Sequence, residues 1–118
     1  MWEVEYTDEF RQWWEELGEA EQDAIARGVE TLRRVGPSLG RPRVDSVYGS
    51  RHSNMKELRT PYAGRPFRTF FAFDPRRTAI LLIGGDKTGD KRFYDRMIAL
   101  ADDLYDTHLA ELRKDGLI

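Results

Sequence analysis

Three strand-length segments joined by very short connections constrain the fold of this chain most strongly. The segments cover residues 55–60, 67–74 and 78–84, and the connections between them are only "PYAGRP" and "PRR". Segments this close together pair as antiparallel neighbours, because a parallel crossover needs about a dozen residues or more. The second and third segments are apolar on both faces, which favours the interior of a sheet. The sequence therefore predicts an antiparallel meander.

A further strand and two helices are predicted before this meander. The segment "WEVEY" at residues 2–6 alternates apolar and acidic side chains, as a half-buried strand does. Thr7 then precedes two acids and an apolar stripe of helical spacing, which makes it a candidate N-cap of a first helix that ends at Gly18. The helical period resumes over residues 19–35 and stops at Gly36. We expect these two helices to form an antiparallel hairpin.

The remaining segments complete the expected order of elements. Residues 37–54 are rich in Gly, Pro and Ser and read as an irregular connector. From Thr88 or Gly89 to about Arg113 the helical period returns. The order is therefore β-α-α-β-β-β-α, which is typical of an α+β domain with helices packed on a small, mainly antiparallel sheet. We expect one domain over residues 1–118, because no internal repeat or linker divides the chain.

The charged residues are segregated along the chain, although the net charge is only −2. Residues 1–40 carry a net charge of −6, residues 41–92 carry +7, and residues 93–118 carry −3. A cationic block between two anionic ones suggests that a polyanionic ligand meets one face of the fold. A solvated surface on which basic side chains happen to cluster would give the same counts.

Several kinds of site are absent from the sequence. There is no cysteine, which excludes disulfides and thiolate metal sites, and the two histidines are far apart. The "GGDKTG" at residues 84–89 does not match a phosphate-binding loop. No apolar run approaches the roughly 20 residues of a membrane span, and the N-terminus does not resemble a signal peptide. We expect a cytoplasmic protein that uses neither a metal nor a cofactor.

The basic side chains concentrate on the predicted hairpin and around the start of the last helix. They are Lys56, Arg59, Arg65, Arg68, Lys87, Lys91 and Arg92. In a meander these segments are neighbours, so we expect the cations to converge on one exposed surface that binds phosphate groups. Tyr94 could stack on an unpaired base at this surface. Arg68 could instead be a strand arginine paired with Asp74 or Glu57, and Tyr94 could lie at the rim of the core.

The segment from Met55 to Tyr105 resembles the HigB-like, phage-Gp49-like branch of the RelE/ParE toxin superfamily. The resemblance rests on "KELR" in one strand, "FRTFFAFD" in the next, and an apolar strand leading to a helix start with Lys87, Lys91 and Tyr94. It implies the RelE-like microbial RNase fold, whose order of elements is the one derived above.

This resemblance also implies a function and assigns roles to the basic residues. It implies the toxin of a type II toxin–antitoxin system, an mRNA interferase whose substrate's 2′-hydroxyl attacks the adjacent phosphate, usually on the ribosome, without a metal. Its partner would be a HigA-like helix-turn-helix antitoxin. The implied catalytic residues are Arg68, Lys87, Lys91 and Tyr94, and the implied RNA-binding residues are Lys56, Arg59, Arg65 and Arg92. A ParE-like inhibitor of DNA gyrase without nuclease activity and a non-toxic RNA-binding module remain alternatives.

Overall fold

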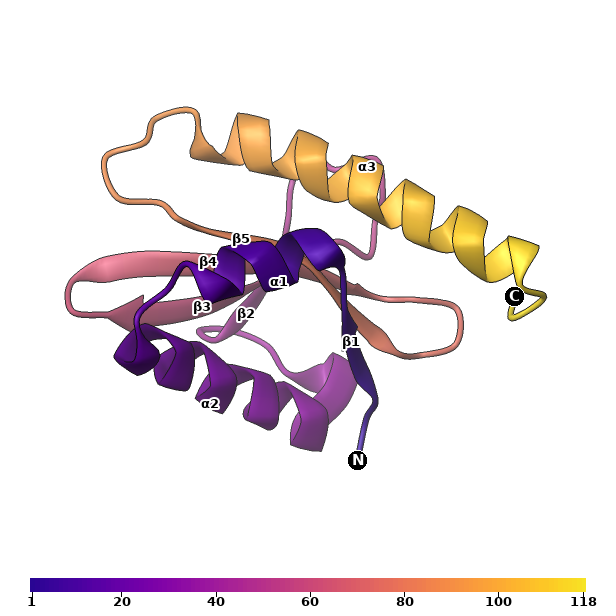
Figure 1. Ribbon diagram of the computed structural model, residues 1–118, viewed down its shortest axis with the longest axis horizontal. Coiled ribbons are helices and arrows are strands. Elements are labelled where there is room, and N and C mark those ends of the chain that lie inside the picture. Colours follow the sequence, from indigo (N-terminus) through magenta and orange to yellow (C-terminus); the bar gives the residue numbers. More distant parts are fainter.

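A computed structural model describes all residues from 1 to 118 (Figure 1). The elements are β1 (Val4–Tyr6), α1 (Asp8–Glu15), α2 (Glu19–Val35), the 3₁₀ turn η1 (Gly36–Ser38), β2 (Val44–Ser46), β3 (Lys56–Tyr62), β4 (Arg65–Phe73), β5 (Ala79–Asp86) and α3 (Phe93–Lys114). The α+β prediction is confirmed. None of the helices combines the length and the apolar character that crossing a membrane requires.

The strands form one five-stranded sheet in the order β1-β5-β4-β3-β2. The pairs β3–β4 and β4–β5 are antiparallel, as the meander predicts. Strand β2 adds a third antiparallel pair with β3, whereas β1 runs parallel to β5. The pairing of β4 with β5 shifts at one point: Phe70 is opposite Ile83 but Phe71 is opposite Leu81, which leaves Leu82 as an extra residue in β5. This bulge turns both Leu82 and Ile83 toward α3, where they join the same apolar cluster.

Helices cover both faces of the sheet and make a three-layer domain (Figure 1). Helices α1 and α2 pack on one face, through a cluster that includes Phe10, Leu32 and Phe71. Helix α3 packs on the other face, through a cluster that includes Phe70 and Phe93. Because successive residues of a strand point to opposite faces, the adjacent Phe70 and Phe71 serve the two layers separately.

Two consecutive glycines in β5 bring aromatic rings close to the backbone from both layers. A Cβ atom added at Gly84 would lie 2.2 Å from the ring of Trp13 in α1, and one added at Gly85 would lie 2.9 Å from the ring of Phe93 in α3. Both helices can therefore approach the sheet closely at this point, because β5 carries no side chain in their way.

The structure confirms one predicted boundary and corrects two. Thr7 caps α1, since its Oγ1 accepts a hydrogen bond from Phe10 N at 3.0 Å. The connector at residues 37–54 is not wholly irregular, because β2 pairs with the start of β3. Helix α3 begins at Phe93 and not near residue 88, because Asp90 Oδ1 accepts from Arg92 N in a turn before the helix. Residues 87–92 are therefore a connection outside the first turn of α3.

Candidate functional site

A cluster of Arg68, Glu57 and Tyr94 joins three elements at the end of the sheet beneath the start of α3. The phenolic O–H of Tyr94 donates to Glu57 Oε1 at 2.8 Å. Arg68 Nε lies 3.3 Å from the same carboxylate oxygen and 3.3 Å from the Tyr94 hydroxyl oxygen. All three groups are therefore within hydrogen-bonding distance of one another.

Strand register explains why these residues meet. Arg59 is directly opposite Arg68, and Glu57 is opposite Phe70, which packs in the α3 cluster. Residues two apart share a face of the sheet, so Glu57, Arg59 and Arg68 all project toward the α3 side. Glu57 and Arg68 are diagonal neighbours across the strands, a separation that long side chains span. The ring of Tyr94 packs edge-on against Phe70 with centroids 6.2 Å apart, which orients its hydroxyl.

The charges within the cluster are mutually compensating. Glu57 is 4% exposed, and its second oxygen, Oε2, lies 3.2 Å from the guanidinium of Arg59. Burial is the main cause that raises the pKa of Tyr94 above its ordinary value, and the hydrogen bond to Glu57 raises it further. The hydrogen bond with Arg68 lowers this pKa but does not cancel the rise. Tyr94 therefore keeps its proton at neutral pH. The ammonium of Lys87 lies 5.3 Å from the centroid of the Tyr94 ring and adds a further cation.

This arrangement suits the chemistry of a phosphate ester. Guanidinium and ammonium groups stabilise charge on a phosphate, and the neutral hydroxyl held against a carboxylate provides a route for a proton. Glu57 is too deeply buried to touch a ligand in this arrangement, and its contacts are with Arg59, Arg68 and Tyr94. No group of three or more His, Asp or Glu side chains is arranged to hold a metal ion.

The structure brings together some of the predicted basic residues and separates others. Arg59, Arg68 and Lys87 surround Glu57 and Tyr94. Lys91 and Arg92 are exposed in the turn that precedes α3.

Lys56 and Arg65 belong to the opposite side of the sheet, so the expected convergence of all the cations is wrong for them. Lys56 is opposite Phe71, which packs under α1 and α2, and its Nζ donates to the carbonyl oxygen of Pro37 at 3.2 Å. Arg65 forms an ion pair with Glu21 of α2. The charge of residues 41–92 was counted along the chain, whereas the alternation of each strand decides which face a side chain reaches.

Glu57 is the residue that the functional prediction missed. In the sequence, Glu57 was identified only as one of two possible structural partners of Arg68, the other being Asp74. The structure selects Glu57, because Asp74 lies at the other end of β4 and accepts from Arg76 and His108 instead. The signal was present in the sequence: Glu57 is an acid two residues before Arg59 in a strand of a strongly basic block.

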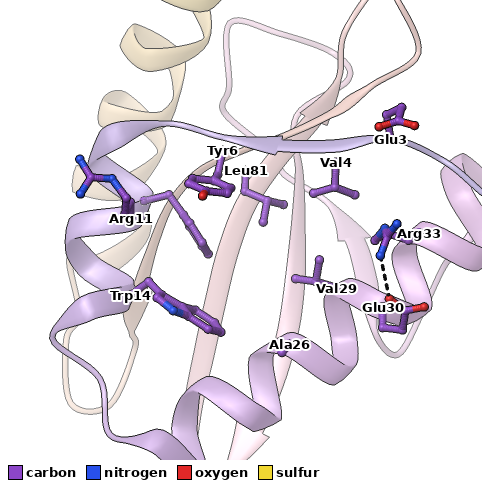
Figure 2. A pocket seen from close by; sticks show the side chains of 11 residues that line it. Glu3, Val4, Tyr6, Arg11, Trp14, Ala26, Val29, Glu30, Arg33 and Leu81 are labelled. Carbon is purple, nitrogen blue, oxygen red and sulfur yellow. Dashed lines mark hydrogen bonds and ion pairs between the residues drawn. The ribbon is translucent and has the colours of Figure 1, made fainter.

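A separate apolar pocket of about 450 Å³ opens between β1, α1 and α2 (Figure 2). Its walls include Val4, Trp14 and Val29, and an ion pair of 3.2 Å between Glu30 and Arg33 lies at its edge. None of the predicted site residues lines it. This pocket is therefore distinct from the cluster around Arg68.

Comparisons with solved structures show which fold this arrangement shares. The isolated RelE toxin of E. coli superposes with a TM-score of 0.53 at 8% sequence identity, covering 82% of this chain and 96% of RelE. A RelE mutant in the free state superposes with the same TM-score of 0.53 and the same 8% identity, covering 78% of this chain and 90% of the mutant. This chain and RelE therefore share a fold, but their sequence identity is too low for residues to be matched one to one.

Comparisons of sequence identify the family. Two proteins of Mycobacterium tuberculosis, named as the candidate toxins HigB2 and HigB3, are each 45% identical to this chain. The match covers 84% of this chain and 50% of HigB2, so the chain spans about half the length of that relative. It covers 88% of this chain and 90% of HigB3. The family described as phage-derived protein Gp49-like (DUF891) matches residues 12–106, and this chain therefore belongs to it.

Proposed function

We propose that this protein is the toxin of a type II toxin–antitoxin pair and that it inhibits translation by cleaving mRNA. The observation that carries the proposal is the Arg68–Glu57–Tyr94 cluster, which combines a cation for phosphate with a proton route. The identity of 45% to two candidate toxins and the RelE-like fold support the same function.

In the proposed reaction, the 2′-hydroxyl of a ribose attacks the adjacent phosphorus atom and the bond from phosphorus to the 5′-oxygen breaks. The products are a 2′,3′-cyclic phosphate and a 5′-hydroxyl. Arg68 contacts the non-bridging oxygens and stabilises the charge that develops on them. Lys87 and Lys91 precede the start of α3, and we expect them to add positive charge near the same phosphate.

Two protons move in this reaction, and the cluster suggests a path for each. Tyr94 accepts the proton of the 2′-hydroxyl as it passes its own proton to Glu57 Oε1, with which it already shares a hydrogen bond of 2.8 Å. The ammonium of Lys87, beside the Tyr94 ring, donates a proton to the leaving 5′-oxygen. After the reaction, the proton on the buried Glu57 returns through Tyr94 to solvent, and Lys87 regains its proton from solvent. Glu57 is a positioning residue in this scheme, because it acts on the substrate only through Tyr94.

The proposal includes a partner and a cellular setting. A helix-turn-helix antitoxin of HigA type would hold the toxin inactive, and the substrate would be mRNA, most effectively mRNA on the ribosome. A small helix-turn-helix gene next to the gene of this protein would support this pairing. The toxin would then act in the cytoplasm, where mRNA is translated.

The test is induced expression of the wild type and of the Arg68→Ala and Tyr94→Phe variants, followed by primer extension on cellular mRNA. We expect the wild type to arrest growth and to produce new 5′ ends in mRNA, and both variants to lose the cuts. Arg113→Ala is the matched control, because Arg113 is an exposed arginine at the far end of α3. Growth arrest without mRNA cuts but with gyrase-dependent DNA damage would contradict the proposal and favour the ParE-like alternative.

A further inference from the structure

A second, polar groove runs between helix α2 and the part of β3 that β2 leaves uncovered. Its volume is about 790 Å³, and it is lined from α2 by Arg27, Gly28, Thr31 and Arg34, which share one face of the helix. Strand β2 pairs with residues 56–58 of β3, and Arg59 N donates to Arg43 O at 2.7 Å, so only the end of β3 beyond Arg59 is left uncovered beside the groove. The groove is thus formed by segments far apart in the chain.

The lining of this groove is strongly cationic. Five arginines line it, namely Arg27, Arg34, Arg43, Arg59 and Arg68, against a single acid, Glu30. Glu30 forms its ion pair with Arg33, outside this set. Arg27, Arg34 and Arg43 form no ion pair, and the one side-chain partner of Arg43 is the hydroxyl of Thr31 at 3.1 Å. Three of the five guanidinium groups are therefore available to an anionic ligand.

Arg27 and Arg34 come from residues 1–40, the part of the chain with a net charge of −6. The net charge of this segment therefore gave no indication of a basic site. Folding adds the two arginines to those of residues 41–92, because α2 packs beside β3. The cationic surface therefore extends beyond the block that the sequence indicated.

Two lining residues also have unused hydrogen-bonding groups. Thr60 is 6% exposed, and its hydroxyl has no hydrogen-bond partner. Arg59 Nε is likewise buried without a partner. Buried polar groups are nearly always paired, so a ligand that enters the groove would gain hydrogen bonds to these two groups once the side chains that cover them move.

We propose that this groove binds the sugar–phosphate backbone of the single-stranded RNA that continues from the cleaved nucleotide. The groove is lined from both faces of the sheet, because Leu58 and Thr60 face α2 whereas Arg59 and Arg68 project toward the α3 side. It therefore passes around the end of β3, and because Arg59 and Arg68 also contact Glu57, it reaches the candidate catalytic cluster. A strand whose scissile phosphate lies at Arg68 enters the groove directly, and Arg27, Arg34 and Arg43 then meet the next phosphates. That the ligand is RNA rests on the proposed function. That the groove binds an anionic ligand rests only on the arginines that line it.

The experiment measures binding of a 2′-O-methylated RNA single strand about 12 nucleotides long, which has no free 2′-hydroxyl and is not cleaved. Fluorescence anisotropy gives its affinity for the wild type and for an Arg27→Gln/Arg34→Gln double variant between about 0.05 and 0.2 M salt. We expect the affinity at 0.1 M salt to fall by about fivefold for each lost contact, and the slope of log affinity against log salt to fall by about 0.7 for each.

The matched control removes two positive charges elsewhere. Arg113 and Lys114 lie exposed at the end of α3, and the Arg113→Gln/Lys114→Gln double variant should keep both the affinity and the salt slope of the wild type. Circular dichroism melting of each variant checks that the fold is retained, as expected from the exposed positions of Arg27 and Arg34.

The outcomes separate this inference from the proposed function. Loss of oligonucleotide affinity in the Arg27/Arg34 variant supports the groove even if the wild type makes no cuts in cellular mRNA. Cuts by the wild type together with an unchanged oligonucleotide affinity in this variant overturn the groove and leave the function standing. A variant that keeps the oligonucleotide but binds the antitoxin less tightly also overturns the inference, because an acidic protein segment would then be the ligand.

Discussion

Tyr94 and Glu57 share a hydrogen bond of 2.8 Å that joins the first turn of α3 to strand β3. The acceptor is a carboxylate that is almost completely shielded from water and balanced by Arg59 and Arg68. A buried charge whose partners are all side chains depends on each of them, because water cannot replace a lost contact. This single bond therefore links the protonation of Tyr94 to the placement of two arginines.

Replacing Glu57 by Gln should lower the pKa of Tyr94 toward its ordinary value, because the negative charge that helps to raise it is removed. Burial, the larger cause, remains. We also expect the free energy of unfolding to fall by about 2 kcal/mol, the contribution of hydrogen bonds to a charged group. NMR titration of the tyrosine Cζ resonances and urea denaturation measure the two effects. Glu111→Gln, at an exposed position of α3, is the control, and an unchanged Tyr94 pKa would show that Glu57 does not influence it.

Replacing Arg68 by Lys keeps the positive charge but removes the Nε–H that lies 3.3 Å from both Tyr94 and Glu57. An ammonium cannot reproduce the planar fork of donors that contacts two groups at once. If Arg68 stabilises the transition state, mRNA cleavage should fall by about 100-fold. Quantified primer extension is the measurement, with Arg113→Lys as the matched substitution. Full cleavage by the Lys variant would mean that charge alone is enough at this position.

Asp74 should make stability depend on pH on the acid side. Burial alone would raise the pKa of this carboxyl, but hydrogen bonds from Arg76, His108 and the backbone outweigh burial and hold it below the ordinary value of 3.8. The unfolded chain thus binds the proton more tightly, so the stabilisation is complete above pH 3.8 and is lost as the pH falls toward the lower folded pKa.

The Asp74→Asn variant should accordingly be less stable than the wild type at pH values near 7, with a difference that shrinks below pH values of about 4. Urea denaturation at neutral pH and at about pH 3 tests this. The exposed Asp115→Asn change should alter stability little at either pH. A difference between Asp74→Asn and the wild type that stays constant across this range would mean that ionisation of Asp74 is not responsible.

Replacing Gly84 by Ala should destabilise the fold, because the added methyl would lie 2.2 Å from the Trp13 ring. Overpacking of this kind typically costs about 1–3 kcal/mol. Gly40→Ala is the matched control, since a Cβ there comes no closer than 4.0 Å to its nearest neighbour, a backbone oxygen. The shift in the midpoint of urea denaturation measures both changes. Equal midpoints for the two variants would show that α1 can move away from β5 at little cost.

Local patterns in the sequence were sufficient for most of the elements. The alternation at residues 2–6, the cap at Thr7 and the short turns of the meander each depend on neighbouring residues, and each predicted element is present. Strand β2 was missed because a three-residue strand has no pattern of its own, and the edge of β3 defines it. The start of α3 was placed too early because the helical period continues into a turn that Asp90 closes.

Only part of the candidate site could be predicted from the sequence, because the face of the sheet that each side chain reaches was not known. The sequence singled out Arg68 and Tyr94, and the structure places them within hydrogen-bonding distance of each other. The sequence did not show that Lys56 and Arg65 lie apart from Arg68 and Tyr94. This separation depends on which helix packs on each face of the sheet. Arg27 and Arg34 required the packing of α2 beside β3, a contact between segments that no local pattern connects.

The parallel pairing of β1 with β5 affects when a newly made chain can finish folding. Thr7 N donates to Leu81 O at 3.0 Å, and the Thr7 hydroxyl donates to Leu82 O at 2.6 Å, so the first strand is anchored by residues synthesised much later. Contacts this distant in sequence form slowly and only after the intervening chain has emerged from the ribosome. Tyr94 follows β5 in the chain, so the candidate catalytic cluster also forms late. A nascent chain of this protein should therefore remain inert through most of its own translation.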